Sequence, residues 1–474
     1  MSFRGVNRWF KAVFLVAALS AETATANGFE IETGIERLSS PQTLIEGLHR
    51  LYVGRRVNDR FSFGQGIYGA AMGDAGGAFF WGFEGVLRQP LTDRLSLSFA
   101  GFLGGGGGAA QVNGHGTMVR AALGLDYRVS PHWDLQLTAS RVRISGAPID
   151  GGAWGLGLRY RFHADRADSR RNPEFDSVAV TASGLRAASG VRLRSGGAQG
   201  AFILMGARAS FDISPRTSLS FSAAGAAQGA QGYMHIMGAA RRNMALRRLV
   251  FFAEGSLGLG GGGDVDTGNG LLIGATLGVQ APVTRGLGVE LSFGALTAPS
   301  GGFRGSAVSL ALVRRFDGTQ GTEPQRWAFS AGVSAQQTGA GYFIAPPGPS
   351  SMVIMQESSI DYFIGRHAYL TGNAQTTMYG GVAGYAIGMV GVGYEFPISR
   401  RWSLSFEGHL GAAGGGGVNT AGGIIYGYRA ELDYRVRDTF SLSLGVGQLA
   451  TVRSGGMRPM VLTLGTKIPF TTHR

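Results

Sequence analysis

The chain contains no cysteine among its 474 residues, which excludes a small extracellular domain held together by disulfides. After residue 26 it also lacks any run approaching the roughly 18 consecutive apolar residues that a membrane-spanning helix needs. Residence in a membrane by means of helices is therefore excluded. Any insertion into a bilayer has to use strands.

The sequence has no concentrated basic patch, although 43 Lys and Arg against 30 Asp and Glu give it a formal net charge of +13. Its arginines stand singly within segments that alternate apolar and polar residues. Proteins that bind nucleic acid concentrate basic residues along one face or one helix. We therefore expect no nucleic-acid partner.

The first 26 residues have the order of a secretory signal peptide. Basic residues come first, then an apolar run from Ala12 to Leu19, then the small residues Ala24-Thr-Ala26. Cleavage is expected before Asn27. Export of a chain without cysteine is compatible with the periplasm or the outer membrane of a Gram-negative bacterium.

The chain does contain a sequence module that is repeated three times. Phe162, Phe316 and Phe470 follow one another at equal spacing, and each ends a segment of alternating residues. Leu123-Gly-Leu-Asp-Tyr-Arg-Val129 in the first copy corresponds to Ala430-Glu-Leu-Asp-Tyr-Arg-Val436 in the third. Such a repeat predicts three copies of one domain. The predicted units are a signal peptide at 1–26, repeats at 27–162, 175–316 and 327–474, and periplasmic linkers at 163–174 and 317–326.

The alternation within each copy is that of strands and not of helices. From Ile424 to Val436 one face carries Tyr426, Tyr428, Leu432 and Tyr434, and the other carries charged residues. Each copy divides into about eight segments of about 10 to 12 residues, the length that crosses a bilayer at a tilt. Aromatic residues stand near the segment ends, as in an interfacial girdle. The pattern predicts an all-β, antiparallel, up-and-down transmembrane β-barrel of about 24 strands.

The pattern is compatible with two ways of closing the strands into barrels. The strands can form three separate eight-stranded barrels or one merged barrel of about 24 strands, wide enough for a polymer. Linkers longer than the turns within a copy, and an aromatic closing strand in each copy, favour separate closure. The longest external loop is expected from Thr338 to Ser358, around Pro346-Pro-Gly-Pro349.

The ends of the copies carry a family resemblance. Tyr160-Arg-Phe162 and Lys467-Ile-Pro-Phe470 resemble the carboxy-terminal insertion signal of bacterial outer-membrane proteins, although the chain continues past Phe470. Each copy is similar in size and layout to the small eight-stranded barrels of that class. The resemblance implies residence in the outer membrane of a Gram-negative bacterium, with outer-membrane lipid and the outer-membrane insertion machinery as partners.

Charged residues on the inward faces are the candidate site. A charge in a lumen has to be paired or wetted, because a lone buried ion costs several kcal/mol. Because both signs occur, the set predicts a salt-bridge network that fills a narrow barrel; the alternative is a lining that selects anions. The candidate residues are Glu84, Arg88, Arg120, Asp126, Arg128, Arg159 and Arg161 in the first copy, and Glu407, Arg429, Glu431, Asp433, Arg435 and Lys467 in the third.

No catalytic, cofactor or metal site is predicted. The lipid A deacylases also use an eight-stranded barrel, with a catalytic His and Ser on a late strand. The corresponding segments here, 135–142, 289–296 and 442–449, contain no histidine. The expected function is therefore that of a non-enzymatic outer-membrane barrel with a structural or surface-docking role. The alternative is a conduit or porin that passes an anionic polymer or a bulky solute.

Overall fold

A computed structural model of the protein describes six stretches of the chain. These are residues 29–39, 43–161, 176–284, 286–316, 325–345 and 348–472. The predicted signal peptide, the linker at 163–174 and residues 317–324 of the second linker lie outside the described residues. In the described part, 24 antiparallel strands form and no helix does. No helix long and apolar enough to cross a membrane occurs among these residues.

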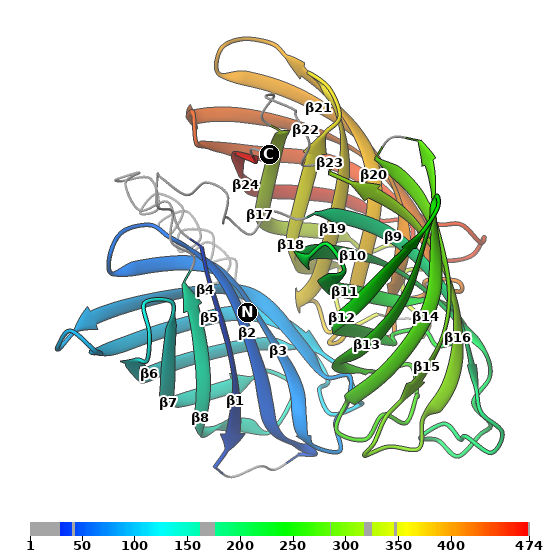
Figure 1. Cartoon of the computed structure of the whole chain (residues 1–474), viewed down its shortest axis with the longest axis horizontal. Coiled ribbons are helices and arrows are strands. Elements are labelled where there is room, and N and C mark those ends of the chain that lie inside the picture. Colours follow the sequence, from blue (N-terminus) through cyan, green and yellow to red (C-terminus); the bar gives the residue numbers. More distant parts are fainter. Residues whose placement is uncertain are drawn as a thin grey trace.

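The strands form three barrels that close separately (Figure 1). The first and last strands of each set of eight pair with one another, so Glu30 lies opposite Arg161 in the first barrel and Trp327 lies opposite Phe470 in the third. The predicted all-β class and separate closure are therefore confirmed, and a merged barrel is excluded.

Strands of 10 to 14 residues build the three barrels. The first barrel contains β1 (Phe29–Leu38), β2 (Ile45–Arg56), β3 (Phe61–Gly73), β4 (Phe79–Pro90), β5 (Leu95–Gly107), β6 (Thr117–Arg128), β7 (Trp133–Ile144) and β8 (Ile149–Arg161). The second contains β9 (Ser177–Ala187), β10 (Phe202–Ser214), β11 (Thr217–Gln228), β12 (Met234–Leu246), β13 (Leu249–Gly261), β14 (Leu271–Thr284), β15 (Leu287–Thr297) and β16 (Arg304–Arg315). The third contains β17 (Gln325–Gln337), β18 (Met352–Phe363), β19 (Ala368–Tyr379), β20 (Ala386–Pro397), β21 (Trp402–Gly414), β22 (Ile424–Arg437), β23 (Phe440–Thr451) and β24 (Met460–Thr472).

The outward faces of the barrels are apolar, as the alternation predicts. In the third barrel, Leu432, Leu444 and Leu464 are register neighbours on β22, β23 and β24, and Leu444 is 51 % exposed. Closed barrels leave no unpaired strand edge, so an apolar outer wall of this kind is compatible with lipid contact.

The two ends of each barrel differ. At the end that holds the chain termini, which we call the termini end, short turns such as 57–60 and 129–132 join the strands. Longer connections such as 108–116 lie at the other end, which we call the loop end. Aromatic pairs face outward near the termini end, as the girdle predicts: Trp402 and Tyr434 have ring centroids 4.8 Å apart. In outer-membrane barrels the short turns face the periplasm.

One strand begins earlier than the sequence predicts. β18 starts at Met352 and not near Ile360, so the expected loop from Thr338 to Ser358 ends at residue 351. Alternation is hidden here because two outward residues of β18, Gln356 and Ser358, are polar and buried. Gln356 donates a hydrogen bond to Gln65 of the first barrel, at 3.1 Å. Buried polar residues of this type hold membrane segments together.

The three barrels contact one another in the same way. The third strand of each barrel lies against the fifth strand of another: β3 against β13, β11 against β21 and β19 against β5. The contacts are head-to-tail, and three of them close a ring around a common centre (Figure 1). The chain therefore has the arrangement of a trimer of small barrels made from one polypeptide.

Glycine permits the close approach at the loop end. The amide of Gly76 donates to the Gly268 carbonyl of the second barrel at 2.8 Å, and Gly384 of the third barrel donates to Gly106 of the first at 2.9 Å. At Gly77, which has a φ of 91°, a Cβ would lie 2.2 Å from the Gly262 nitrogen. The glycine-rich segments of the sequence thus serve the contacts between barrels as well as the turns.

We expect Gly105→Ala to lower the free energy of unfolding by about 1 to 3 kcal/mol, because overpacking a tight contact forces the backbones apart. A Cβ at Gly105 would lie 2.0 Å from the Thr377 carbonyl oxygen of the third barrel. Gly101 is the matched control, since it lies on the same strand with no atom within 4 Å of its Cβ position. Urea unfolding in liposomes measures both variants. Equal effects of the two would contradict the close contact between barrels.

Candidate functional site

Each lumen is divided into an apolar part at the loop end and a polar part toward the termini end. In the first barrel the apolar part includes Leu48, Tyr68, Phe80 and Phe102, all at most 2 % exposed. Equivalent clusters around Phe202 and Tyr385 occupy the loop ends of the second and third barrels. We call each of these clusters an apolar plug.

The polar part of the first lumen is an extended charge network. Arg50 bonds Glu32 and Glu84, both at 2.7 Å, and thereby joins β1, β2 and β4. Arg88 bonds Glu30 at 2.8 Å and also contacts Glu32. Because Arg50 serves two carboxylates and Arg88 serves three, and Glu32 is shared by both, the network does not divide into independent pairs. The carboxylates of this network are Glu30, Glu32, Glu36, Glu84, Asp126 and Asp134, and the guanidiniums are Arg50, Arg88, Arg120, Arg159 and Arg161.

The network continues from the middle of the first lumen to its rim. Arg120, which is 2 % exposed, pairs with Glu36 beneath the apolar plug. Toward the termini end, Arg159 bonds Asp134 through Nε at 2.6 Å, and Arg161 bonds the same carboxylate at 2.9 Å. Near-equal numbers of the two charges leave little uncompensated charge in the lumen, as burial requires.

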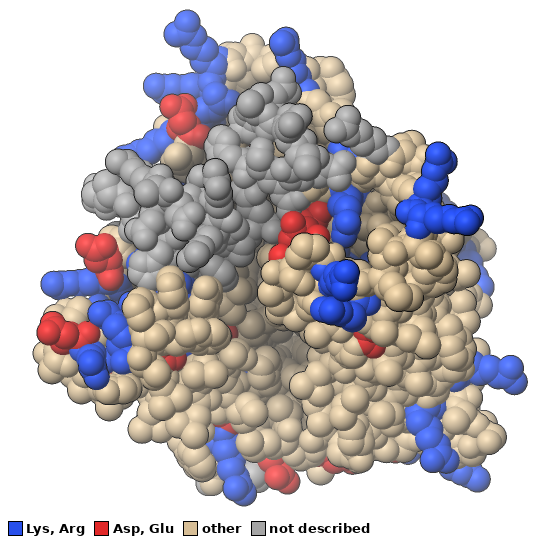
Figure 2. All heavy atoms as spheres, in the orientation of Figure 1, with Lys and Arg blue, Asp and Glu red and all other residues tan. Residues whose placement is uncertain are grey.

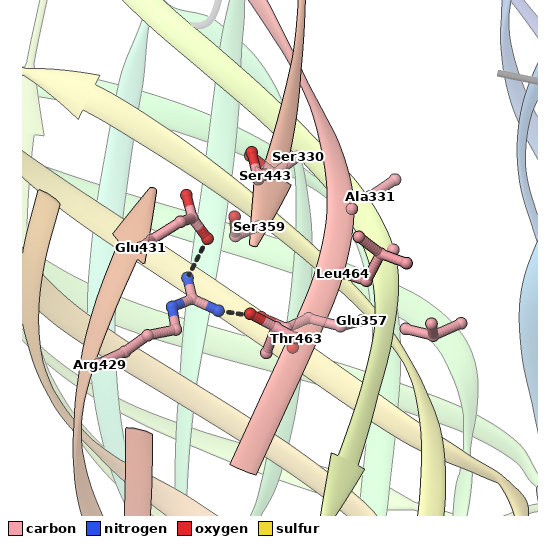
Figure 3. Close-up of a pocket in the computed structure, with 12 residues that line it drawn as sticks. Ser330, Ala331, Glu357, Ser359, Arg429, Glu431, Ser443, Thr463 and Leu464 are labelled. Carbon is pink, nitrogen blue, oxygen red and sulfur yellow. Dashed lines mark hydrogen bonds and ion pairs between the residues drawn. The ribbon is translucent and has the colours of Figure 1, made fainter. Parts of the chain in front are cut away.

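The third lumen holds a second network with an excess of carboxylates. Arg429 of β22 reaches across the lumen to Glu357 of β18 and also pairs with Glu431 on its own strand (Figure 3) and with Glu407 on the neighbouring β21. Lys467 bonds Glu431 at 2.7 Å and Asp433 at 2.9 Å. The carboxylates are Glu357, Asp361, Glu407, Glu431 and Asp433, and they face the cations Arg429 and Lys467, with His409 beside Glu407.

Little space remains inside the third network. The cavity drawn in Figure 3 has a volume of about 20 Å³ and is lined by Arg429, Glu431 and neighbouring small residues. That is room for about one water molecule. Side chains therefore fill the lumen at the level of this network, where Glu431, Asp433 and Lys467 are buried.

The second lumen has only a small charge cluster among its described residues. Arg208 makes a bidentate contact with Glu290, at 2.9 and 2.8 Å. Arg241 bonds Glu290 at 2.7 Å and Glu254 at 2.8 Å, and its guanidinium lies 3.6 Å from the ring centroid of Phe252. Two cations and two anions balance in this cluster.

The structure brings most of the sequence-predicted residues together. Glu84, Arg88, Arg120, Asp126, Arg159 and Arg161 share the first lumen, and Glu407, Arg429, Glu431, Asp433 and Lys467 share the third. Arg128 and Arg435 lie apart from these networks, exposed at the termini ends of β6 and β22. They were expected among the lumen charges because they occupy the alternate positions of their strands that face the lumen. Both lie near the ends of these strands, and their side chains reach solvent.

Twelve members of the two charge networks and of the charge cluster in the second lumen were missed by sequence reasoning. The first strand gave a usable signal, because Glu30, Glu32 and Glu36 are all even-numbered positions of one alternating segment. The second repeat gave only isolated charges. The missed residues are Glu30, Glu32, Glu36, Arg50, Asp134, Arg208, Arg241, Glu254, Glu290, Glu357, Asp361 and His409.

Outside the lumens, the charged side chains belong mainly to the rims. Figure 2 shows basic side chains projecting around the periphery of one face, with largely uncharged surface between them. A hollow of about 380 Å³ at the termini end of the first barrel is lined by Arg94, Arg128 and Arg161. The basic surplus of the chain is thus a property of the rims and not of the lumens.

The chain was compared with known families, curated proteins and solved structures. No family model and no curated protein matches it. It is similar to the ferric enterobactin receptor of Pseudomonas aeruginosa in complex with enterobactin, at 10 % identity and a TM-score of 0.30 over 95 % of this chain and 82 % of that chain. The siderophore receptor PirA of Acinetobacter baumannii gives 12 % identity and a TM-score of 0.30 over 95 % and 81 %. OpdR of Pseudomonas aeruginosa gives 10 % identity and a TM-score of 0.23 over 94 % and 95 %.

The class of the protein follows from the barrels themselves. All three close without an edge, carry apolar outward faces and enclose charges inside, and the first and third carry aromatic pairs at the termini end. Only closed barrels and helices can span a bilayer, because lipid offers no partner to an unpaired backbone group. The chain therefore has the architecture of a membrane-spanning β-barrel protein, in three eight-stranded units.

Proposed function

We propose that the protein is a structural or surface-docking component of the outer membrane, with its lumens closed and without enzymatic activity. The observation that carries this proposal is the filling of the first and third lumens by charge networks beneath apolar plugs. An eight-stranded barrel has an interior that side chains can fill completely. In this proposal the barrels act through their surfaces and loops.

The lumen charges do not favour an anion-selective conduit. In the third barrel five carboxylates face two permanent cations, so the field of that lumen repels anions. In the first barrel both signs are nearly balanced and are bonded to one another. Their role is therefore proposed to be structural.

Catalysis is excluded from the proposal on chemical grounds. His235 and His409 face inward, beside Tyr233 and Glu407, and neither joins a serine to a carboxylate. A nucleophile, a base and an orienting acid in contact are what hydrolytic sites need. The expected partners are outer-membrane lipid along the outward faces and the insertion machinery at β24, whose Phe470 stacks on Trp327.

A liposome-swelling assay tests the proposal. Proteoliposomes that contain the unmodified protein should take up a monosaccharide no faster than protein-free liposomes, because the described lumens offer no continuous path through the first and third barrels. A general porin reconstituted in the same lipid is the positive control. Swelling at the porin's rate would contradict the closed-lumen proposal and support a conduit.

A further inference from the structure

The second barrel differs from the other two in how its inward residues are exposed. On β10 the inward residues from Gly206 to Ser210 are all partly exposed, and the exposure continues to Asp212 at the rim. On β14 the inward residues from Gly274 to Gln280 are partly exposed as well. Along β10 and β14 the exposure of the inner wall therefore continues toward the termini end, whereas Ser218 and Glu290 on β11 and β15 are buried.

The strands equivalent to β10 in the other barrels are closed to solvent over most of their length. On β2, the second strand of the first barrel, Arg50, Tyr52 and Gly54 are buried. On β18, the second strand of the third barrel, the inward residues from Val353 to Asp361 are buried too. The three repeats thus share one backbone but differ in the filling of the lumen.

Side-chain size explains the difference. The inner wall of the second barrel carries Ser183, Ser222, Ser256, Thr276 and Ser309 at positions that are partly exposed. These residues are too small to meet across an interior that longer side chains would just fill. Their hydroxyl groups can hydrogen-bond water and small polar solutes.

The loop end of the same barrel is closed by aromatic rings. Phe202 is 2 % exposed, and its ring centroid lies 5.3 Å from that of Tyr233 and 5.9 Å from that of Phe303. Leu204, Met237 and other buried apolar residues complete this plug. An apolar constriction blocks ions because water does not wet it.

We propose that the second barrel holds an aqueous chamber that is open at the termini end and lined by hydroxyl groups. The chamber admits water, ions and small polar solutes, and the apolar plug around Phe202 closes it at the loop end. Besides its plug, the described part of the second barrel holds only the small cluster of Arg208, Arg241, Glu254 and Glu290. The first and third barrels are closed by a plug and by an extended charge network, so the second barrel alone is a latent pore. This goes beyond the proposed function, which concerns the closed state of the unmodified protein.

Cysteine labelling tests the chamber, and the cysteine-free chain allows single-cysteine variants without further changes. Ser222→Cys and Ser256→Cys should react with a charged methanethiosulfonate reagent about tenfold faster than buried controls, because access limits thiol reactivity. The matched controls are Ser98→Cys in the first barrel and Ser405→Cys in the third, whose serines are 6 % and 0 % exposed. Equal, slow labelling at all four positions would overturn the chamber.

Conductance tests the plug. Phe202→Ala/Phe303→Ala should raise the planar-bilayer conductance about tenfold over the unmodified protein. The two substitutions remove rings of the apolar plug, and this joins the chamber to the loop end. Phe80→Ala/Phe102→Ala removes two equally buried rings from the first plug and should not raise it, since the network under that plug remains.

Heat-modifiable migration on gels confirms that each variant is folded. No gain in the second-barrel variant, or an equal gain in both, would overturn the latent pore. If a plug variant fails to fold, the labelling result still decides whether the chamber exists. A conducting unmodified protein, by contrast, would contradict the proposed function and leave the labelling comparison intact.

Discussion

Arg88→Ala is expected to lower the free energy of unfolding by about 3 to 5 kcal/mol, because it removes one partner from buried ion pairs. Arg88 bonds Glu30 at 2.8 Å, contacts Glu32 and reaches Asp126 at 3.3 Å. Without the guanidinium, these carboxylates remain in the lumen with their charges only partly compensated. Urea unfolding of the protein in liposomes, followed by tryptophan fluorescence, measures the loss.

Arg128→Ala is the matched control for this change. Arg128 lies in the same barrel but is exposed at the rim, outside the charge network, so its removal should change stability by about 0.5 kcal/mol or less. If Arg88→Ala costs no more than this control, the lumen charges are wetted and screened, and the network does not support the barrel.

Leu444→Arg is expected to cost about 2 to 4 kcal/mol, the penalty for an arginine on the lipid face of a barrel near the middle of the bilayer. Leu444 is 51 % exposed, points outward from β23 and lies in a row with Leu432 and Leu464. The outward wall is apolar at this level, so the guanidinium finds no partner. The same unfolding measurement in liposomes gives the difference.

Val436→Arg provides the comparison at the membrane surface. Val436 also lies on the third barrel, 44 % exposed, but near the termini end of β22. An arginine near the interface costs about 0 to 1 kcal/mol, because its charge reaches the headgroups. A similar small cost at both positions would mean that this face of the third barrel does not contact lipid.

The late strands of the third repeat could be assigned from sequence because their two faces contact different media. Between Ile424 and Val436 one face contacts lipid and the other contacts paired charges, so polarity alternates without interruption. β18 lacked this signal, since Gln356 on its outward face is buried against the first barrel. Alternation reports burial against lipid and not burial against another barrel, which is why the start of β18 was predicted too late.

The composition of the charge networks was less predictable than their existence. The alternation of inward and outward positions predicted Arg429, Glu431 and Lys467 in one lumen. The structure pairs Lys467 with both Glu431 and Asp433. Arg435 has the same parity but reaches solvent, so replacing Glu431 and Asp433 would strand Lys467 and Arg429 and not Arg435. Which side chains meet across a lumen depends on strand tilt and stagger, and neither is encoded in a local pattern.

The arrangement of the three barrels could not be predicted from the repeat itself. A repeat predicts that the copies share a fold, but the contact between the third strand of one barrel and the fifth of another depends on small residues such as Gly105 and Gly77. From sequence, glycine-rich segments are equally compatible with turns and with contacts between barrels. Only their positions against a second barrel distinguish the two roles.

The most direct test of closed lumens is the conductance of the unmodified protein in a planar bilayer. Three separately closed barrels, each blocked at the loop end by an apolar plug and two of them also filled with paired charges, should give no stable channels above the background of the lipid. Stable channels of nanosiemens size in the unmodified protein would contradict the closed lumens and with them the structural role of the lumen charges.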